Sequence, residues 1–92
     1  MMKSEQAETI ALQALSFLAK DDELLSHFLT FTGLTPEELK KHFREPELLG
    51  GVLDAILSND TILLDFCNAT SLSPDTIVRA RQALPGGFTP ST

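Results

Sequence analysis

The sequence predicts an all-α fold, a compact bundle of about six short helices. Three observations lead to this prediction. Apolar residues recur every three or four positions along most of the chain, which is the spacing of helix faces. Tyr and Trp are absent, so residues that favour strands are scarce. One sequence motif occurs twice, at residues 28–39 and 66–77. It has the pattern of a helix end, then a three-residue corner, then a capped helix start.

The length of 92 residues fits one domain, and we expect residues 1–87 to form it, followed by a flexible tail at 88–92. The first helix is predicted to begin with Ser4 as its cap and to end near Lys20. Two apolar stripes predict that this helix is covered on more than one side and lies at the centre of the bundle. One stripe contains Ala7, Ile10, Ala11, Ala14, Phe17 and Leu18, and the other contains Leu12, Leu15 and Ala19.

The second helix is predicted to start at Asp21 or Asp22 and to close at Gly33, where a left-handed residue fits. Thr35 and Glu38 then have the spacing of a capping box that opens the third helix. The predicted buried positions of these two helices are Leu24, Leu25, Phe28, Leu29, Phe31, Leu39 and Phe43.

Pro46 is predicted to begin the fourth helix, in which the glycines at 50–51 would each cost about 1 kcal/mol relative to Ala. Close packing against a neighbouring helix would offset that cost. Asn59 or Asp60 is the expected cap of the fifth helix, and Ser73 that of the sixth, which a Pro-Gly-Gly stretch ends. The predicted inward residues are Leu49, Val52, Leu53, Ile56, Leu57, Ile62, Leu63, Phe66, Cys67, Ile77, Ala80 and Leu84.

A shift of 38 residues places residues 14–43 on residues 52–81, with helix caps on caps and apolar positions on apolar positions. This pattern predicts two tandem three-helix-like repeats. A unit of this length is too small to fold alone, so the two would share one core. Functional differences are expected where the copies differ, as at Phe31 and Phe43, which align with Ala69 and Arg81. The identical pairs are Leu15/Leu53, Asp22/Asp60, Leu25/Leu63, Phe28/Phe66, Thr32/Thr70, Leu34/Leu72 and Pro36/Pro74.

Charge and composition argue against several classes of protein. A net charge of -6 repels nucleic acid and anionic membranes at long range. Cys67 is the only cysteine, so no disulfide can form within the chain. No apolar run approaches the roughly 20 residues that span a bilayer, and the first residues lack a signal-peptide pattern. These features predict a cytoplasmic protein that does not bind membranes.

Three segments together resemble a family of short bacterial proteins known only as a domain of unknown function. They are the opening at residues 4–19, the Leu53-Asp54 region, and the closing stretch from Arg79 to Gly87. The resemblance covers roughly residues 4–87. It implies a small helical, cytoplasmic protein, and it supplies no activity or site residues to transfer.

The residues that could take part in catalysis or metal binding have simpler structural interpretations. His27, His42 and Cys67 match no zinc-binding spacing, and Cys67 aligns with Leu29 as a small core residue. The acidic residues at 21–23 occupy a predicted helix start, where negative charge is favourable. No nucleophile and base can be paired from this sequence. We therefore predict no enzyme activity, no cofactor and no metal site.

The favoured function is a protein-interaction module that binds an unknown protein partner or itself. Its candidate contact residues are Phe31 and Phe43, where the repeats differ, and Phe88 beyond the predicted last helix. The competing interpretation is that Phe31 and Phe43 are simply core residues.

The alternative function is that of a helix-turn-helix nucleic-acid-binding or regulatory protein. Residues 64–84 have the usual spacing of that motif, and Arg79 and Arg81 on the second helix would contact the nucleic acid. The acidic net charge disfavours this function, and any two helices joined by a short corner would give the same pattern.

Overall fold

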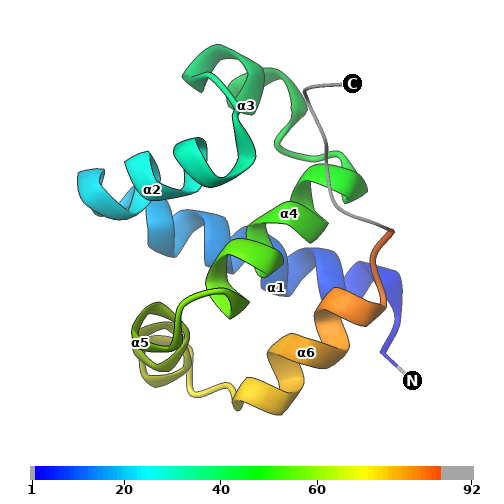
Figure 1. The fold of residues 1–92 in the computed structure, drawn as a ribbon. Coiled ribbons are helices and arrows are strands. Elements are labelled where there is room, and N and C mark those ends of the chain that lie inside the picture. The colour runs from blue at the N-terminus through cyan, green and yellow to red at the C-terminus, as the bar shows by residue number, and fades with distance from the viewer. Residues whose placement is uncertain (1, 86–92) are drawn as a thin grey trace.

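Six helices and no strand make up residues 2–85, the part of the chain that the computed structural model describes. The predicted all-α bundle of six short helices is therefore confirmed (Figure 1). The predicted tail at 88–92, including Phe88, lies outside the described residues. The helices are α1 (Ser4–Ala19), α2 (Asp22–Thr32), α3 (Pro36–His42), α4 (Pro46–Leu57), α5 (Asp60–Thr70) and α6 (Pro74–Gln82).

Helix α4 is the centre of the bundle. It packs against α1, α2, α5 and α6, and Figure 1 shows it crossing the middle of the molecule in front of α1. Its side chains are buried around almost the whole circumference, as expected for a helix with neighbours on several sides. The buried residues are Leu48, Leu49, Gly50, Gly51, Val52, Leu53, Ala55 and Ile56.

The prediction that the first helix is central was wrong. α1 buries a single stripe formed by Ala7, Ile10, Ala11, Ala14 and Leu18. In the second predicted stripe, Leu12 and Ala19 are exposed and Leu15 is only half-buried. Alanines dominate the buried stripe, and their small side chains allow the close packing of α1 on α4 and α6. The predicted cap was also wrong: Lys3 occupies the cap position, and Ser4 is already the first helical residue.

The other predicted helix starts and corners are confirmed. Asp21 and Asn59 cap α2 and α5 through their side chains. Thr35 and Glu38 form the predicted capping box, in which the Thr35 side chain accepts from the Glu38 N–H and the Glu38 carboxylate accepts from the Thr35 N–H. Ser73 caps α6, accepting from the N–H of Thr76. Each of these bonds satisfies an N–H that a helix start would otherwise leave unpaired.

The corners α2–α3 and α5–α6 have the same backbone plan. Gly33 closes α2 with φ 75°, and Ser71 closes α5 with φ 60°, both in the left-handed region. The bounds of α2 and α5, and the first residues of α3 and α6, are all 38 residues apart. The tandem repeat itself stays a prediction, because similar corners also arise without a common ancestor.

The two halves differ most in their third helices. α6 packs on α1 and α4 and buries Ile77 and Ala80 completely. α3 buries no residue, and in Figure 1 it projects at the opposite end of the molecule from α6. The second half therefore contributes three helices to the core, whereas the first contributes mainly α1 and α2.

Gly50 is closely approached, as predicted for a glycine inside the fourth helix, but by the segment that follows α6 and not by a neighbouring helix. A Cβ atom at this position would lie 2.9 Å from the backbone oxygen of Pro85, a distance too short for a carbon–oxygen contact. The chain after α6 thus crosses directly over α4, and only a residue without a side chain permits that approach.

Candidate functional site

The α2–α3 corner, which we define as residues 31–44, contains the most exposed aromatic side chain of the described residues. Phe31 is 48% exposed, so its predicted burial was wrong and the prediction that it can contact a partner stays open. Phe43 is half-buried, and the guanidinium carbon of Arg44 lies 5.3 Å from the centre of its ring. Phe28, one helical turn before Phe31, is fully buried and anchors α2 to the core.

The corner is also the main basic region of a strongly acidic chain. Three of the seven Lys and Arg residues lie in it, and all three, Lys40, Lys41 and Arg44, are exposed. The two acidic residues of the corner lie in the first turn of α3, where their negative charge interacts favourably with the helix dipole. His42 pairs with Glu45 through its Nδ1 atom. Lys40 and Lys41 are exposed on α3, and the guanidinium of Arg44 lies over the Phe43 ring.

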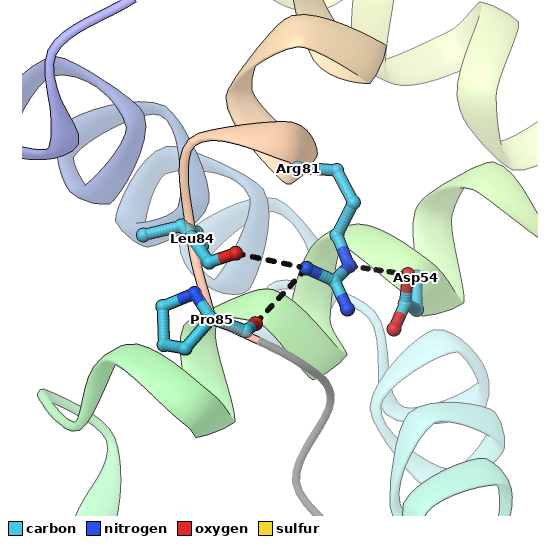
Figure 2. A network of polar contacts seen from close by, with 4 residues as sticks. All are labelled: Asp54, Arg81, Leu84 and Pro85. Atoms are coloured by element: carbon cyan, nitrogen blue, oxygen red, sulfur yellow. Dashed lines mark hydrogen bonds and ion pairs between the residues drawn. The ribbon is translucent and has the colours of Figure 1, made fainter.

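Arg81, one of the two predicted nucleic-acid contacts, is held within the fold. Figure 2 shows its side chain between α4 and the chain segment that follows α6. Its Nε donates to Oδ1 of Asp54 at 2.6 Å, and its Nη1 donates to the backbone oxygens of Leu84 and Pro85 at 3.4 and 3.0 Å. Only 21% of the side chain is exposed. These hydrogen bonds connect the end of α6 and the segment after it to α4.

Arg79, the other predicted nucleic-acid contact, is oriented away from the core. Its Nε lies 3.0 Å from Oδ2 of Asp75 one turn earlier in α6, and both side chains are largely exposed. The two arginines of α6 therefore have different surroundings, and each has a carboxylate partner. Neither placement tests nucleic-acid binding directly.

A surface pocket of about 460 Å³ lies where the start of α1 meets the end of α6. Sequence reasoning did not anticipate it, since its two walls are more than 70 residues apart in the chain. Of its lining residues, only Arg79 was a predicted site residue, as a nucleic-acid contact. The lining residues are Met2, Gln6, Arg79, Gln82 and Ala83.

The remaining candidate residues occupy separate places. His27 is exposed on α2, whereas Cys67 is 7% exposed in α5, as predicted for a small core residue. Burial raises the pKa of the Cys67 thiol, so the neutral form is favoured at neutral pH. Within residues 2–85, no three His, Cys, Asp or Glu side chains come together in a way that could hold a metal ion.

The comparisons with known proteins agree with the sequence resemblance. The family described as "Protein of unknown function (DUF3572)" matches residues 4–87. The chain belongs to this family. No curated protein and no solved structure matches the chain. Of the helices in the described part, none has the length and apolar character needed to cross a membrane.

Proposed function

We propose that this DUF3572 family member is a non-enzymatic binding module that docks its α2–α3 corner on an acidic surface of a protein partner. The observation that carries the proposal is the exposure of Phe31, at 48% of its surface, in a corner that also carries the exposed cationic side chains of Lys40, Lys41 and Arg44. Aromatic side chains are enriched at the centres of protein interfaces, and polar or charged side chains form the rim around them.

The energetics favour Phe31 as the main contact. Complete burial of a Phe side chain contributes about 1.5–3 kcal/mol, so covering the exposed half of Phe31 would supply roughly half of that value. Lys40, Lys41 and Arg44 would add electrostatic attraction that speeds association and selects acidic partners. The rest of the chain carries a net charge of about -7 and would repel such a partner, which directs docking to this corner.

The absence of enzyme activity belongs to the proposal. Two observations support it: the Cys67 thiol is buried and mainly protonated, and the histidines lie on the exposed side of α2 and beside Glu45. We also propose a cytoplasmic location, since a single buried cysteine gives the chain no disulfide to form in an oxidising compartment.

The experiment that tests the proposal is site-specific photo-crosslinking. A photoreactive benzoyl-phenylalanine replaces Phe31 in the full chain, which is expressed in cells of the native host. The control places the same group at Leu64 on α5, the most exposed large apolar residue of the described chain at 55%. Irradiation is carried out on cell lysates, with and without 0.5 M salt and with and without prior nuclease treatment, and the crosslinked peptides are identified by mass spectrometry.

We expect one defined protein to be crosslinked at position 31, in a salt-sensitive manner, and not at position 64. Phe31→Ser should remove the partner from native pull-downs, whereas Leu64→Ser should leave it in place. Equal crosslinking from both positions, or none from position 31, would overturn the proposal. Crosslinking to a second copy would identify self-association as the mode of binding instead of a separate acidic partner.

Nucleic-acid binding is the alternative that the same experiment can promote. Its support is the helix-corner-helix arrangement of α5 and α6, with Ser71 in a left-handed conformation and Arg79 exposed. Arg81 is already engaged by Asp54 and two backbone carbonyls, which weakens the case. Partners lost on nuclease treatment, together with crosslinks to DNA or RNA, would favour this alternative.

A further inference from the structure

The pocket between α1 and α6 has the size and the polar groups of a small-molecule site. Its volume of about 460 Å³ lies within the usual range of ligand sites, roughly 300–1,000 Å³. Gln6 on α1 and Arg79 and Gln82 on α6 line it, together with Met2 just before α1 and Ala83 just after α6, and the two helices pack on one another. We propose that it binds a small organic carboxylate that also carries an amide group, such as an N-acylated amino acid.

The carboxylate is assigned to Arg79. The Nε of Arg79 faces Asp75 at 3.0 Å, but its Nη1 and Nη2 groups make no hydrogen bond or ion pair with any other described residue. A guanidinium group presents pairs of parallel N–H donors that match the two oxygens of a carboxylate. Arg79 is thus positioned by Asp75 and keeps donors available for a ligand.

The amide is assigned to Gln6 and Gln82, which line the same pocket from α1 and α6. Neither side chain hydrogen-bonds to another described residue. Each can donate from its NH₂ group and accept at its oxygen, which is the pattern that a ligand amide requires. Met2 and Ala83 supply an apolar wall for the small alkyl part of the ligand.

The surroundings favour a monovalent carboxylate over a phosphate. Asp75 stands beside Arg79 and cancels much of its charge, and the whole chain carries -6. A divalent anion would meet more repulsion there than a carboxylate, which carries a single charge. The same reasoning predicts that Asp75 weakens ligand binding while it orients Arg79.

The test is an NMR titration of the full ¹⁵N-labelled chain with N-acetyl-L-alanine, followed through backbone amide, Gln side-chain and Arg Nε signals. Parallel titrations use the methyl ester of the same compound, which lacks the carboxylate, and inorganic phosphate. The variants are Arg79→Gln and Asp75→Asn. Lys20→Gln serves as the control, since it removes one positive charge from an exposed side chain at the opposite end of α1 from Gln6. Far-UV circular dichroism verifies that each variant is folded.

We expect saturable shifts centred on Gln6, Arg79 and Gln82, with a dissociation constant on the order of 1 mM. Arg79→Gln should weaken binding about tenfold or more, Asp75→Asn should strengthen it about threefold, and Lys20→Gln should leave it unchanged. The ester and phosphate should bind at least several-fold more weakly. Non-saturating shifts, shifts that persist in Arg79→Gln, or equal binding of the ester or phosphate would each overturn the assignment.

Discussion

Helices α3 and α6 begin alike and end in different places. Each follows a left-handed corner, starts with a Pro after a Thr or Ser cap, and stands 38 residues from its counterpart. α6 nevertheless buries Ile77 and Ala80 against α1 and α4, while α3 has no fully buried residue and only its half-buried Leu39 packs against the core. Local signals therefore determine where each helix begins, and its later residues determine whether it joins the core.

The residues at matched positions explain the difference. Ile77 and Ala80 lie one turn apart on α6, and the small Ala80 permits a close approach to its neighbours. α3 has Leu39 and His42 at the same positions, and the imidazole is both larger and polar. Burying His42 would remove a polar ring from water and separate it from Glu45, with which it pairs. α3 therefore stays at the periphery of the core, with Phe31 exposed at the corner before it.

Core truncation should give the largest contrast between the two helices. Ile77→Ala removes a fully buried side chain and is expected to lower the free energy of unfolding by about 2–5 kcal/mol. Leu39→Ala, at the matching position of α3, removes a half-buried side chain and should cost about 1 kcal/mol or less. Urea denaturation followed by circular dichroism measures both. Equal losses would mean that α3 is as much a part of the core as α6.

The crossing of the C-terminal segment over α4 gives the next prediction. Gly50→Ala should gain about 1 kcal/mol in helix propensity, yet the new methyl group would meet the Pro85 oxygen at 2.9 Å. Neither the new Cβ atom nor the Pro85 carbonyl oxygen can rotate away as the end of a side chain could. We therefore expect a net destabilisation of about 1–3 kcal/mol. A more stable Gly50→Ala variant in the same denaturation assay would show that the segment can move away from α4 at little cost.

The two arginines of α6 sharpen the comparison within one helix. Arg81→Met breaks the hydrogen bonds to Asp54 and to two carbonyl oxygens and should cost about 1–2 kcal/mol. Arg79→Met breaks only an exposed ion pair and should cost less than about 0.5 kcal/mol. A double-mutant cycle with Asp54→Asn isolates the Arg81–Asp54 interaction. Matching losses for both arginines would contradict the structural role of Arg81.

The helix caps give the smallest expected effects. Ser73→Ala should lower global stability by about 0.5–1 kcal/mol, because α6 cannot unfold without exposing Ile77. Thr35→Ala removes half of a capping box, but it should mainly fray α3 and leave the midpoint of global unfolding almost unchanged. Denaturation midpoints together with NMR amide signals in α3 separate the two outcomes.

Much of the fold could be predicted because its signals are local. The caps Asp21, Thr35, Asn59 and Ser73 and the left-handed Gly33 depend only on residues within one turn. The central helix was misassigned because periodicity does not reveal how many neighbours a helix has. The stretch at 48–53, in which leucines, glycines and a valine are all buried, carried the better signal. Small residues there permit neighbours on every side.

The candidate sites could be predicted only in part. Phe31 was named as a possible contact, but its burial was misjudged because it follows Leu24 and Phe28 at helical spacing on the same side of α2. The partner of Arg81 lies 27 residues away on α4, and Gln6 and Gln82 meet only after α1 packs on α6. Such long-range pairs depend on the tertiary arrangement, which no local pattern encodes.

Native-state hydrogen exchange tests the central claim most directly, namely that α6 belongs to the core and α3 does not. Amide protons of residues 77–80 in α6 should exchange only through global unfolding, with protection close to the full stability of the protein. Those of residues 39–42 in α3 should exchange at least about tenfold faster, through local opening that denaturant hardly affects. If both segments showed the same protection and the same denaturant dependence, α3 would be an integral part of the core and the account would be wrong.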